Sequence, residues 1–200
     1  MISNTNRISF FLLVICFLYD CQSQNIGLET KERKSSNLAE SEIKETCPIP
    51  LALGSVYGTS ISKFDQTVIL SQIKILLSDL CDRSFSHLLS LIHPTKGLYV
   101  DAKGFWTLEE VEKDLKDPNG YFQVYYFDSE TLDQKKGTVG NLTLRSVFLS
   151  TKQTIVDLYV GSSEEVEVKF RFPENPKLER YLINPSFIKW EKNWYLQRMF

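Results

Sequence analysis

The side chains that could carry acid–base chemistry gather around one predicted turn. His93 precedes Pro94 at the end of a predicted helix, and Tyr99 and Asp101 follow shortly after it. If that helix end faces a cavity, His93, Tyr99, Asp101 and Tyr125 would form a pocket in which His93 or Asp101 acts as a general base. The alternative is that His93 caps the turn and gains from the helix dipole when it is protonated. We favour this structural role, so the sequence assigns no catalytic residue.

Motifs that hold metals or activate nucleophiles are not found in the sequence. It has no CxxC motif, Cys/His cluster or HExxH motif for zinc, and no GxSxG elbow or glycine-rich phosphate loop. Asp128, Glu130 and Asp133 could bind calcium, but they lack the EF-hand spacing, and a solvated turn is the simpler interpretation. We therefore predict no cofactor and no metal. His87 is interpreted as a residue of a helix surface.

The composition argues against nucleic acid as a partner. Lys and Arg number 23 and Asp and Glu 25, a formal net charge of -2, so no basic field attracts phosphates. Hydrophobic residues make up 42%, enough to build a core. Aromatic residues could line a cavity or an interface. However, aromatic residues are common in β-strands in general, so a role in the hydrophobic core is the simpler interpretation. The group comprises Trp106, Tyr121, Tyr125, Tyr126, Phe127, Trp190, Trp194 and Tyr195.

The first 21 residues have the pattern of an export signal. Residues 8–19 are almost wholly apolar and follow Arg7, which suits a signal peptide and is short for a membrane-spanning helix. Cys21 comes next and a polar stretch follows it. An apolar run, a cysteine and a polar tether are the arrangement of a bacterial lipoprotein precursor, in which the thiol receives a diacylglycerol that holds the protein to the membrane.

The lipidation motif around Cys21 is partial. Leu18 stands three residues before Cys21, as the motif requires, but Asp20 occupies a position where a small residue is usual. Cys16 is a weaker candidate because it lies within the apolar run. The alternatives are a cleaved secretory signal, which would release a soluble protein, and an uncleaved anchor.

A polar tether and a folded domain are predicted after the signal. Residues 22–45 show no sustained hydrophobic stripe, so we assign 22–62 to a flexible tether and 63–200 to one domain. Cys47 and Cys81 remain once Cys16 and Cys21 are assigned to signal and anchor. In an oxidising compartment this pair would form a disulfide. The alternative is a free Cys47 and a buried Cys81.

Helices are predicted in the first half of the domain. Apolar residues at helical spacing run through residues 66–92, with a break predicted at 82–84. The stripe consists of Ile69, Ile73, Leu76 and Leu80. Thr107 and Glu110 form a capping box that opens a second helix.

Strands are predicted in the second half, after a short one at 98–100. Residues 121–127 are aromatic-rich and 154–160 are apolar, while 142–149 is ambiguous between strand and helix. Residues 166–172 alternate apolar and charged side chains, as in a half-buried antiparallel strand. Residues 187–190 and 194–200 form a closing hairpin. The fold class is α+β, with N-terminal helices packed on a curved antiparallel sheet.

Two segments carry a resemblance to a known group of proteins. LLSLIHPTKGLYVD at 88–101 and FIKWEKNWYLQRMF at 187–200 resemble segments of uncharacterised exported proteins of bacteria, and the chain as a whole looks like a spirochaetal lipoprotein. The resemblance implies a fold like that of the nuclear-transport-factor (cystatin-like) family, with helices packed into a strongly curved sheet. It implies no catalytic residues.

Two functions are consistent with these observations. The first is a lipid-anchored protein of the cell envelope that binds an unknown protein or a small apolar ligand without catalysis. The second is a small pocket enzyme, a hydrolase or isomerase, that uses His93 or Asp101. Secretion into the medium is an alternative to anchoring.

Overall fold

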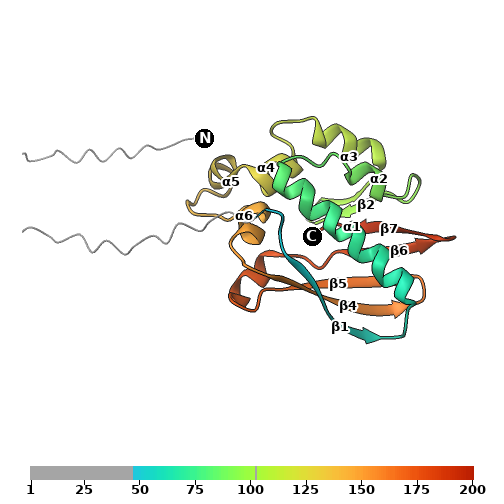
Figure 1. Ribbon diagram of the computed structural model, residues 1–200. Coiled ribbons are helices and arrows are strands. Elements are labelled where there is room, and N and C mark those ends of the chain that lie inside the picture. The colour runs from blue at the N-terminus through green and yellow to red at the C-terminus, as the bar shows by residue number, and fades with distance from the viewer. Residues whose placement is uncertain (1–46, 102) are drawn as a thin grey trace, which may run out of the picture. The chain divides into compact units, whose positions relative to one another are not determined.

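The computed structural model describes residues 47–101 and 103–200 (Figure 1). The predicted signal peptide, Cys16, Cys21 and most of the predicted tether lie outside the described residues. Within the described ranges, no helix is both long and apolar enough to cross a membrane.

One sheet of seven strands forms the centre of the described fold, in the order β1-β4-β5-β6-β7-β2-β3. Its strands are β1 (Leu51–Gly58), β2 (Leu98–Val100), β3 (Gly104–Trp106), β4 (Thr154–Ser162), β5 (Glu165–Arg171), β6 (Ser186–Trp190) and β7 (Asn193–Arg198). β1 pairs in parallel with β4, and β2 pairs in parallel with β7, while the other neighbours are antiparallel.

The helices lie mainly between β1 and β4 in the chain, because parallel neighbours need a long crossover connection. They are α1 (Lys63–Asp82), α2 (Leu88–Leu91), α3 (Leu108–Leu115), α4 (Tyr121–Phe127), α5 (Ser129–Lys136), α6 (Leu144–Leu149) and the 3-10 helix η1 (Pro176–Tyr181). The α+β class is therefore confirmed. The sheet differs from the predicted curved antiparallel sheet in two respects: two of its pairings are parallel, and it lacks the strong curvature that the resemblance implies.

Helix α1 buries the apolar stripe that its sequence predicts. Ser62 accepts a hydrogen bond from the Asp65 backbone N–H (3.0 Å) and caps the helix. Ile69, Ile73, Leu76 and Leu80 are all fully buried. The helix ends at Arg83, which has left-handed backbone angles (φ 55°), so the predicted break at 82–84 is confirmed.

The folded domain begins before the predicted boundary at Lys63. β1 lies in the segment assigned to the tether and pairs with β4 about a hundred residues later. Within β1, the backbone N–H of Ser55 donates to Asp157 (2.8 Å), and Gly54 lies so close to this carboxylate that a Cβ would clash with it. The strand was not predicted because the small and apolar residues of this segment show no alternation between apolar and polar positions.

The segment Tyr121–Phe127 is helix α4, so the predicted strand there is wrong. Asp114 of α3 accepts hydrogen bonds from the backbone N–H groups of Tyr121 (2.8 Å) and Phe122 (2.9 Å), which caps the helix from outside. Tyr126 is fully buried and donates a hydrogen bond to the Phe200 carbonyl. Capping and burial outweigh the strand propensity of the aromatic side chains. The ambiguous segment 142–149 also contains a helix, α6.

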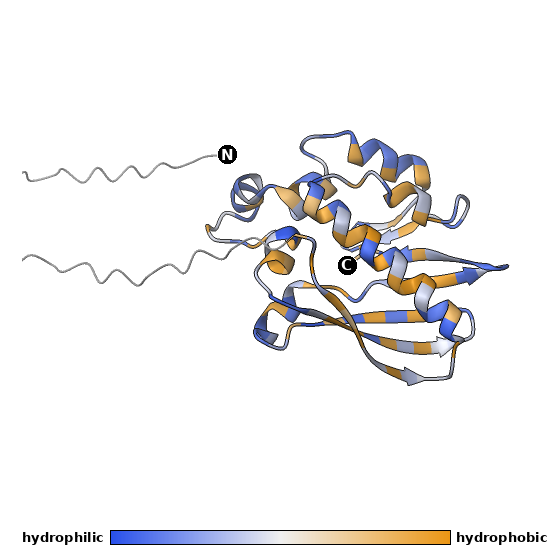
Figure 2. Cartoon of the chain, viewed as in Figure 1, coloured by the Kyte–Doolittle hydropathy of each residue, from blue (hydrophilic) through white to orange (hydrophobic). Residues whose placement is uncertain are grey.

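The second-half strands follow their sequence pattern closely. In β5, Val166, Val168 and Phe170 are buried and alternate with charged residues, as the hydropathy bands of Figure 2 show along the strand. β6 and β7 form the predicted closing hairpin, with Glu191 at positive φ (57°) in its turn. Helix α1 runs across one face of the sheet (Figure 1), and the buried residues of both elements belong to one hydrophobic core.

Cys47 and Cys81 form a disulfide in the structure. The bond joins the segment that leads into β1 to the end of α1, across 34 residues of sequence. It thereby closes a loop that contains the whole of β1 and nearly all of α1.

Candidate functional site

A pocket of about 370 Å³ lies beside helix α4, and we name it the α4 pocket. Its volume falls within the range of small-molecule sites, roughly 300–1,000 Å³. Two residues of the predicted pocket, Asp101 and Tyr125, line it. Tyr121 lies one helical turn before Tyr125, and the two rings stack with 4.7 Å between their centroids. The Tyr121–Tyr125 pair therefore forms one aromatic wall.

The remaining walls of the α4 pocket are mostly aliphatic. They come from the segments around α5, α6 and η1, and comprise Leu132, Leu142, Leu144, Leu182 and Ile183, with the aromatic rings of Tyr181 and Phe200. Leu132 and Phe200 are almost completely buried, while the others are partly accessible. An apolar molecule could bury its surface against this lining.

Charged groups of the α4 pocket are predominantly cationic. Lys103, Lys136 and Arg180 line it together with Asp101, so three positive charges face one negative charge. Arg180 lies over the Tyr181 ring, 5.0 Å from its centroid, and donates to the Tyr181 hydroxyl (3.0 Å). The pocket thus has a positive balance in a chain whose formal net charge is -2.

Tyr121 keeps its proton in this environment. Burial, followed by the nearby negative charge of Asp101, raises the pKa of Tyr121 above its ordinary value of 10.0. The phenol therefore remains a neutral hydrogen-bond donor at physiological pH rather than a base. The pair of tyrosines supplies an apolar surface with polar tips.

His93 lies apart from the α4 pocket and serves the turn that follows α2. The ring Nδ1 accepts hydrogen bonds from the backbone N–H groups of Thr95 and Lys96, both at 3.2 Å. This arrangement requires the neutral tautomer with the proton on Nε2. The buried ring also makes edge contacts with Trp190 and Tyr195. These contacts correspond to the structural interpretation of His93.

The four predicted pocket residues are consequently not brought together. Asp101 and Tyr125 line the α4 pocket, Tyr99 lies in a separate hollow on the sheet, and His93 is not among the residues that line either. Tyr99 lies on the exposed face of β2, opposite its buried neighbours Leu98 and Val100, whereas Asp101 lies in the turn that follows this strand.

A histidine, a carboxylate and a serine meet near the end of α1, although they do not form a catalytic triad. His87 Nδ1 lies 2.6 Å from Oδ1 of the fully buried Asp79 and 3.1 Å from the Ser86 hydroxyl. A triad needs the two ring nitrogens to contact different partners, whereas here both contacts involve Nδ1. The His87 backbone N–H also donates to Asp79 (3.0 Å). The cluster therefore clamps α1 to the start of α2, and His87 does more than occupy a helix surface.

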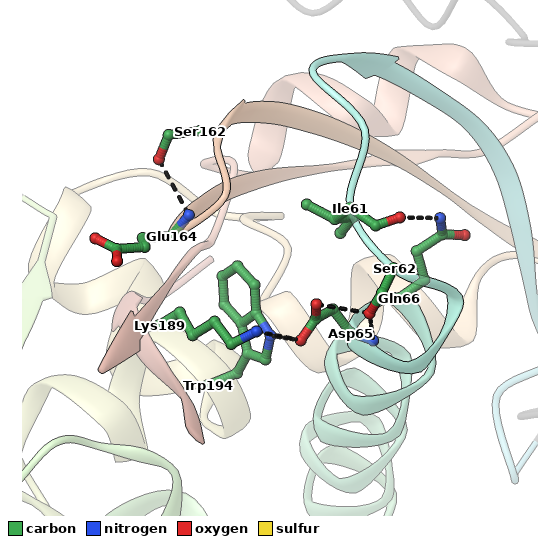
Figure 3. A network of polar contacts seen from close by, with 8 residues as sticks. All are labelled: Ile61, Ser62, Asp65, Gln66, Ser162, Glu164, Lys189 and Trp194. Atoms are coloured by element: carbon green, nitrogen blue, oxygen red, sulfur yellow. Dashed lines mark hydrogen bonds and ion pairs between the residues drawn. The ribbon is translucent and has the colours of Figure 1, made fainter. Parts of the chain in front are cut away.

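A second buried carboxylate joins α1 to the closing hairpin, as Figure 3 shows. Asp65 Oδ1 accepts hydrogen bonds from Lys189 Nζ (2.8 Å) and Trp194 Nε1 (2.7 Å), and Oδ2 accepts one from the Ser62 hydroxyl (2.7 Å). Burial opposes ionisation of Asp65, but these hydrogen bonds and the charge of Lys189 outweigh it and lower its pKa to about 2. We call this group the Asp65 latch.

The acidic residues Asp128, Glu130 and Asp133 do not form the predicted solvated turn, because Asp128 is the N-cap of α5 and the other two lie within this helix. Asp128 caps α5 through the backbone N–H of Thr131 (3.0 Å), and this bond lowers its pKa. Asp133 accepts hydrogen bonds from Asn141 and Gly140, which likewise lower its pKa. In the described part of the chain, His, Cys, Asp and Glu side chains nowhere gather in a group of three or more that could hold a metal.

Sequence reasoning missed most of the lining of the α4 pocket. Lys103, Lys136 and Arg180 come from three separate segments and carry no local motif. The one signal present in the sequence was the aromatic density of Tyr121 and Tyr125, for which the sequence analysis preferred a core role over a cavity lining and predicted a strand.

The fold and the pocket define the class of this domain: an α+β domain with one mixed seven-stranded sheet and, beside its helices, a pocket lined by both apolar and cationic side chains. No protein-family model, no curated protein and no solved structure matches the chain. No particular family is therefore assigned, and the resemblance to spirochaetal lipoproteins and to the nuclear-transport-factor fold stays a prediction.

Proposed function

We propose that this chain is an exported, lipid-anchored protein of the cell envelope whose α+β domain binds a small molecule without catalysis. The anchor is a diacylglycerol on Cys21, with secretion of a soluble form as the alternative. The ligand has an apolar body and an acidic group. The composition of the α4 pocket carries this proposal, because apolar walls combine there with an excess of positive charge.

The chemistry of the α4 pocket favours a carboxylate or similar acid over a neutral ligand. The walls would remove the ligand's apolar surface from water, which contributes roughly 25 cal/mol per Å². Lys103, Lys136 and Arg180 would attract its negative head, and Asp101 is the one acidic residue among the lining residues. Among the described residues none of these three cations forms an ion pair within 4.0 Å, although the charge of Lys136 also acts on Asp133, which lies outside the pocket lining.

The alternative of a pocket enzyme receives no support from this geometry. His93 uses Nδ1 to accept two backbone N–H groups, and it does not line the pocket that contains Asp101. Tyr121 lines the pocket, but its pKa is raised, so its phenol stays protonated and does not act as a base. Binding is the activity that the lining residues favour.

Lipidation at Cys21 is tested by the mass and the location of the mature chain. In a bacterial host we expect the purified protein to begin at Cys21 and to carry the added mass of a diacylglycerol. Cys21→Ser should move the protein from the membrane to the soluble fraction, whereas Cys16→Ser should leave it in the membrane. An unmodified N-terminus would support secretion instead.

Ligand binding is tested with two probes that differ only in their head group, decanoate and decanol. We expect calorimetric titration to show decanoate binding more tightly than decanol. The double variant Lys136→Gln/Arg180→Gln should weaken decanoate binding about fivefold at low salt, because these two charges are exposed and contribute roughly 0.2–1 kcal/mol each. Its decanol affinity should not change.

The matched control is Lys177→Gln. Lys177 belongs to η1 like Arg180, is exposed, and does not line the α4 pocket. Its removal should leave decanoate binding as it is. Equal loss in the control and the double variant would show that general charge, and not the pocket, attracts the probe.

A further inference from the structure

Seven cross-strand neighbours form a continuous row over the whole width of the sheet, and we name it the transverse row. Each is the register partner of the next. From one edge to the other they are Tyr57, Tyr159, Glu167, Ser186, Arg198, Tyr99 and Phe105. Six strand spacings give the row a length of roughly 29 Å. Because register partners lie on the same face of a sheet, these side chains share one surface.

Both ends of the transverse row are aromatic and accessible. Tyr57 and Tyr159 stack on each other at 4.8 Å between centroids, and their exposed fractions are 45% and 39%. At the other end, Tyr99 and Phe105 are 44% and 56% exposed. Folding alone does not require four large rings to stay half in water, and such an arrangement is typical of a binding surface.

A hollow follows the row between these aromatic ends. Two adjoining depressions of about 370 Å³ each share Glu165 and Glu167 in their linings. One contains Tyr57 and Tyr159, and the other contains Tyr99 and Phe105. The shared residues place the two depressions side by side along the row, so together they suit an elongated occupant.

The polar centre of the row is held in place before any ligand arrives. Arg198 Nη2 donates to Glu167 Oε2 (2.6 Å), and Arg198 Nε donates to the Asn184 carbonyl (2.7 Å). The Asn184 side-chain amide donates to the other Glu167 oxygen (2.7 Å). The guanidinium keeps further N–H groups for a ligand, and the side chain of Gln197 adds both a donor and an acceptor.

We propose that the transverse row is a binding site for a neutral oligosaccharide. Sugar rings present apolar C–H faces that stack on aromatic side chains, and hydroxyl groups that both donate and accept hydrogen bonds. The hollow offers aromatic faces at its ends and, between them, acceptors on Glu165 and Glu167 together with donors on Arg198.

The charge of the hollow separates this ligand from the other elongated candidates. Two carboxylates and one guanidinium leave a balance of -1, which repels the phosphates of a nucleic acid or the sulfates of an acidic polysaccharide. A basic peptide would use only the acceptors, while one of the two carboxylates is already paired with Arg198. A neutral ligand that uses donors and acceptors together matches the row best.

The site is tested by calorimetric titration of the full chain with cellotetraose, maltotetraose and chitotetraose. We expect at least one of them to bind, and Tyr99→Ala and Tyr159→Ala each to weaken its affinity about fivefold or more, the effect of losing one stacked ring. Tyr99→Phe, which keeps the ring, should retain most of the affinity. Phe64→Ala removes an aromatic residue that is more exposed (73%) and lies outside the row, and should have no effect.

Three outcomes would overturn the proposal. None of the oligosaccharides binds; one binds but with the same affinity in both tyrosine-to-alanine variants; or pentalysine or a heparin oligosaccharide binds in a manner that depends on Tyr99 while the neutral sugars do not. Decanoate titrations of the same variants keep the two sites apart, because Tyr99→Ala should leave the α4 pocket unaffected.

Discussion

Loss of the Cys47–Cys81 disulfide is expected to lower the free energy of unfolding by about 3–4 kcal/mol. The two cysteines are 34 residues apart, so the bond removes much of the chain entropy that a loop of this length has in the unfolded state. The double variant Cys47→Ala/Cys81→Ala should show this loss in urea unfolding followed by circular dichroism. We expect β1 to lose its protection from hydrogen exchange first, because it is an edge strand directly after Cys47.

The disulfide's own contribution can be separated from side-chain packing. Cys47 is exposed and Cys81 is partly buried, so Cys47→Ala alone breaks the bond without opening a gap in the core. Wild-type protein treated with a reductant should match this single variant. If both have the stability of the oxidised wild type, the bond does not constrain the unfolded chain in solution.

Replacing Asp65 by alanine should cost about 2–4 kcal/mol of stability. The substitution leaves Lys189 Nζ and the buried Trp194 Nε1 without their shared acceptor, and it removes the contact between α1 and a hairpin more than a hundred residues later. Asp65→Asn keeps an oxygen acceptor, so its loss of stability should be smaller than that of Asp65→Ala. Urea midpoints and slopes of the two variants, measured at neutral pH, give the comparison.

The matched control for the Asp65 latch is Glu112→Ala. Glu112 forms an ion pair with Lys116 at 2.6 Å, as short as any in the latch, but both side chains are largely exposed. Its loss should change stability by less than about 0.5 kcal/mol. A similar cost at both positions would show that burial adds nothing to the latch.

The latch also predicts a dependence of stability on acid. The pKa of Asp65 falls from 3.8 to about 2 on folding, so the folded state binds this proton less tightly than the unfolded state. The stabilisation is complete above about pH 4 and disappears as the pH falls towards 2. Because the Lys189 side chain is partly exposed to solvent, we expect the contribution to be about 1–2 kcal/mol. In Asp65→Ala this part of the acid dependence should be missing.

Segments with a strong local pattern were predicted correctly from the sequence. The stripe of α1 is buried as expected, and Thr107 and Glu110 form both hydrogen bonds of the predicted capping box. β5 alternates in its burial, and β6 and β7 form the hairpin. These features depend on neighbours a few residues apart, which the sequence displays directly.

Segments whose conformation depends on distant partners were predicted poorly. β1 has no alternation of its own and exists because β4 offers it a parallel neighbour. Helix α4 is rich in residues that favour strands, yet Asp114 caps its first turn and the core buries Tyr126. In both cases tertiary contacts override local propensity.

The sequence by itself determined the α+β class, the helix α1, the capping box and the closing strands. Only the tertiary structure decided which side chains share a surface. Asp101 lies near Lys136 and Arg180 in the α4 pocket, and Tyr99 lies in line with Tyr159 across the sheet, because strand order and register join segments that are far apart in the chain. Neither spacing nor composition encodes that register locally, since it is set when the whole sheet assembles around its core.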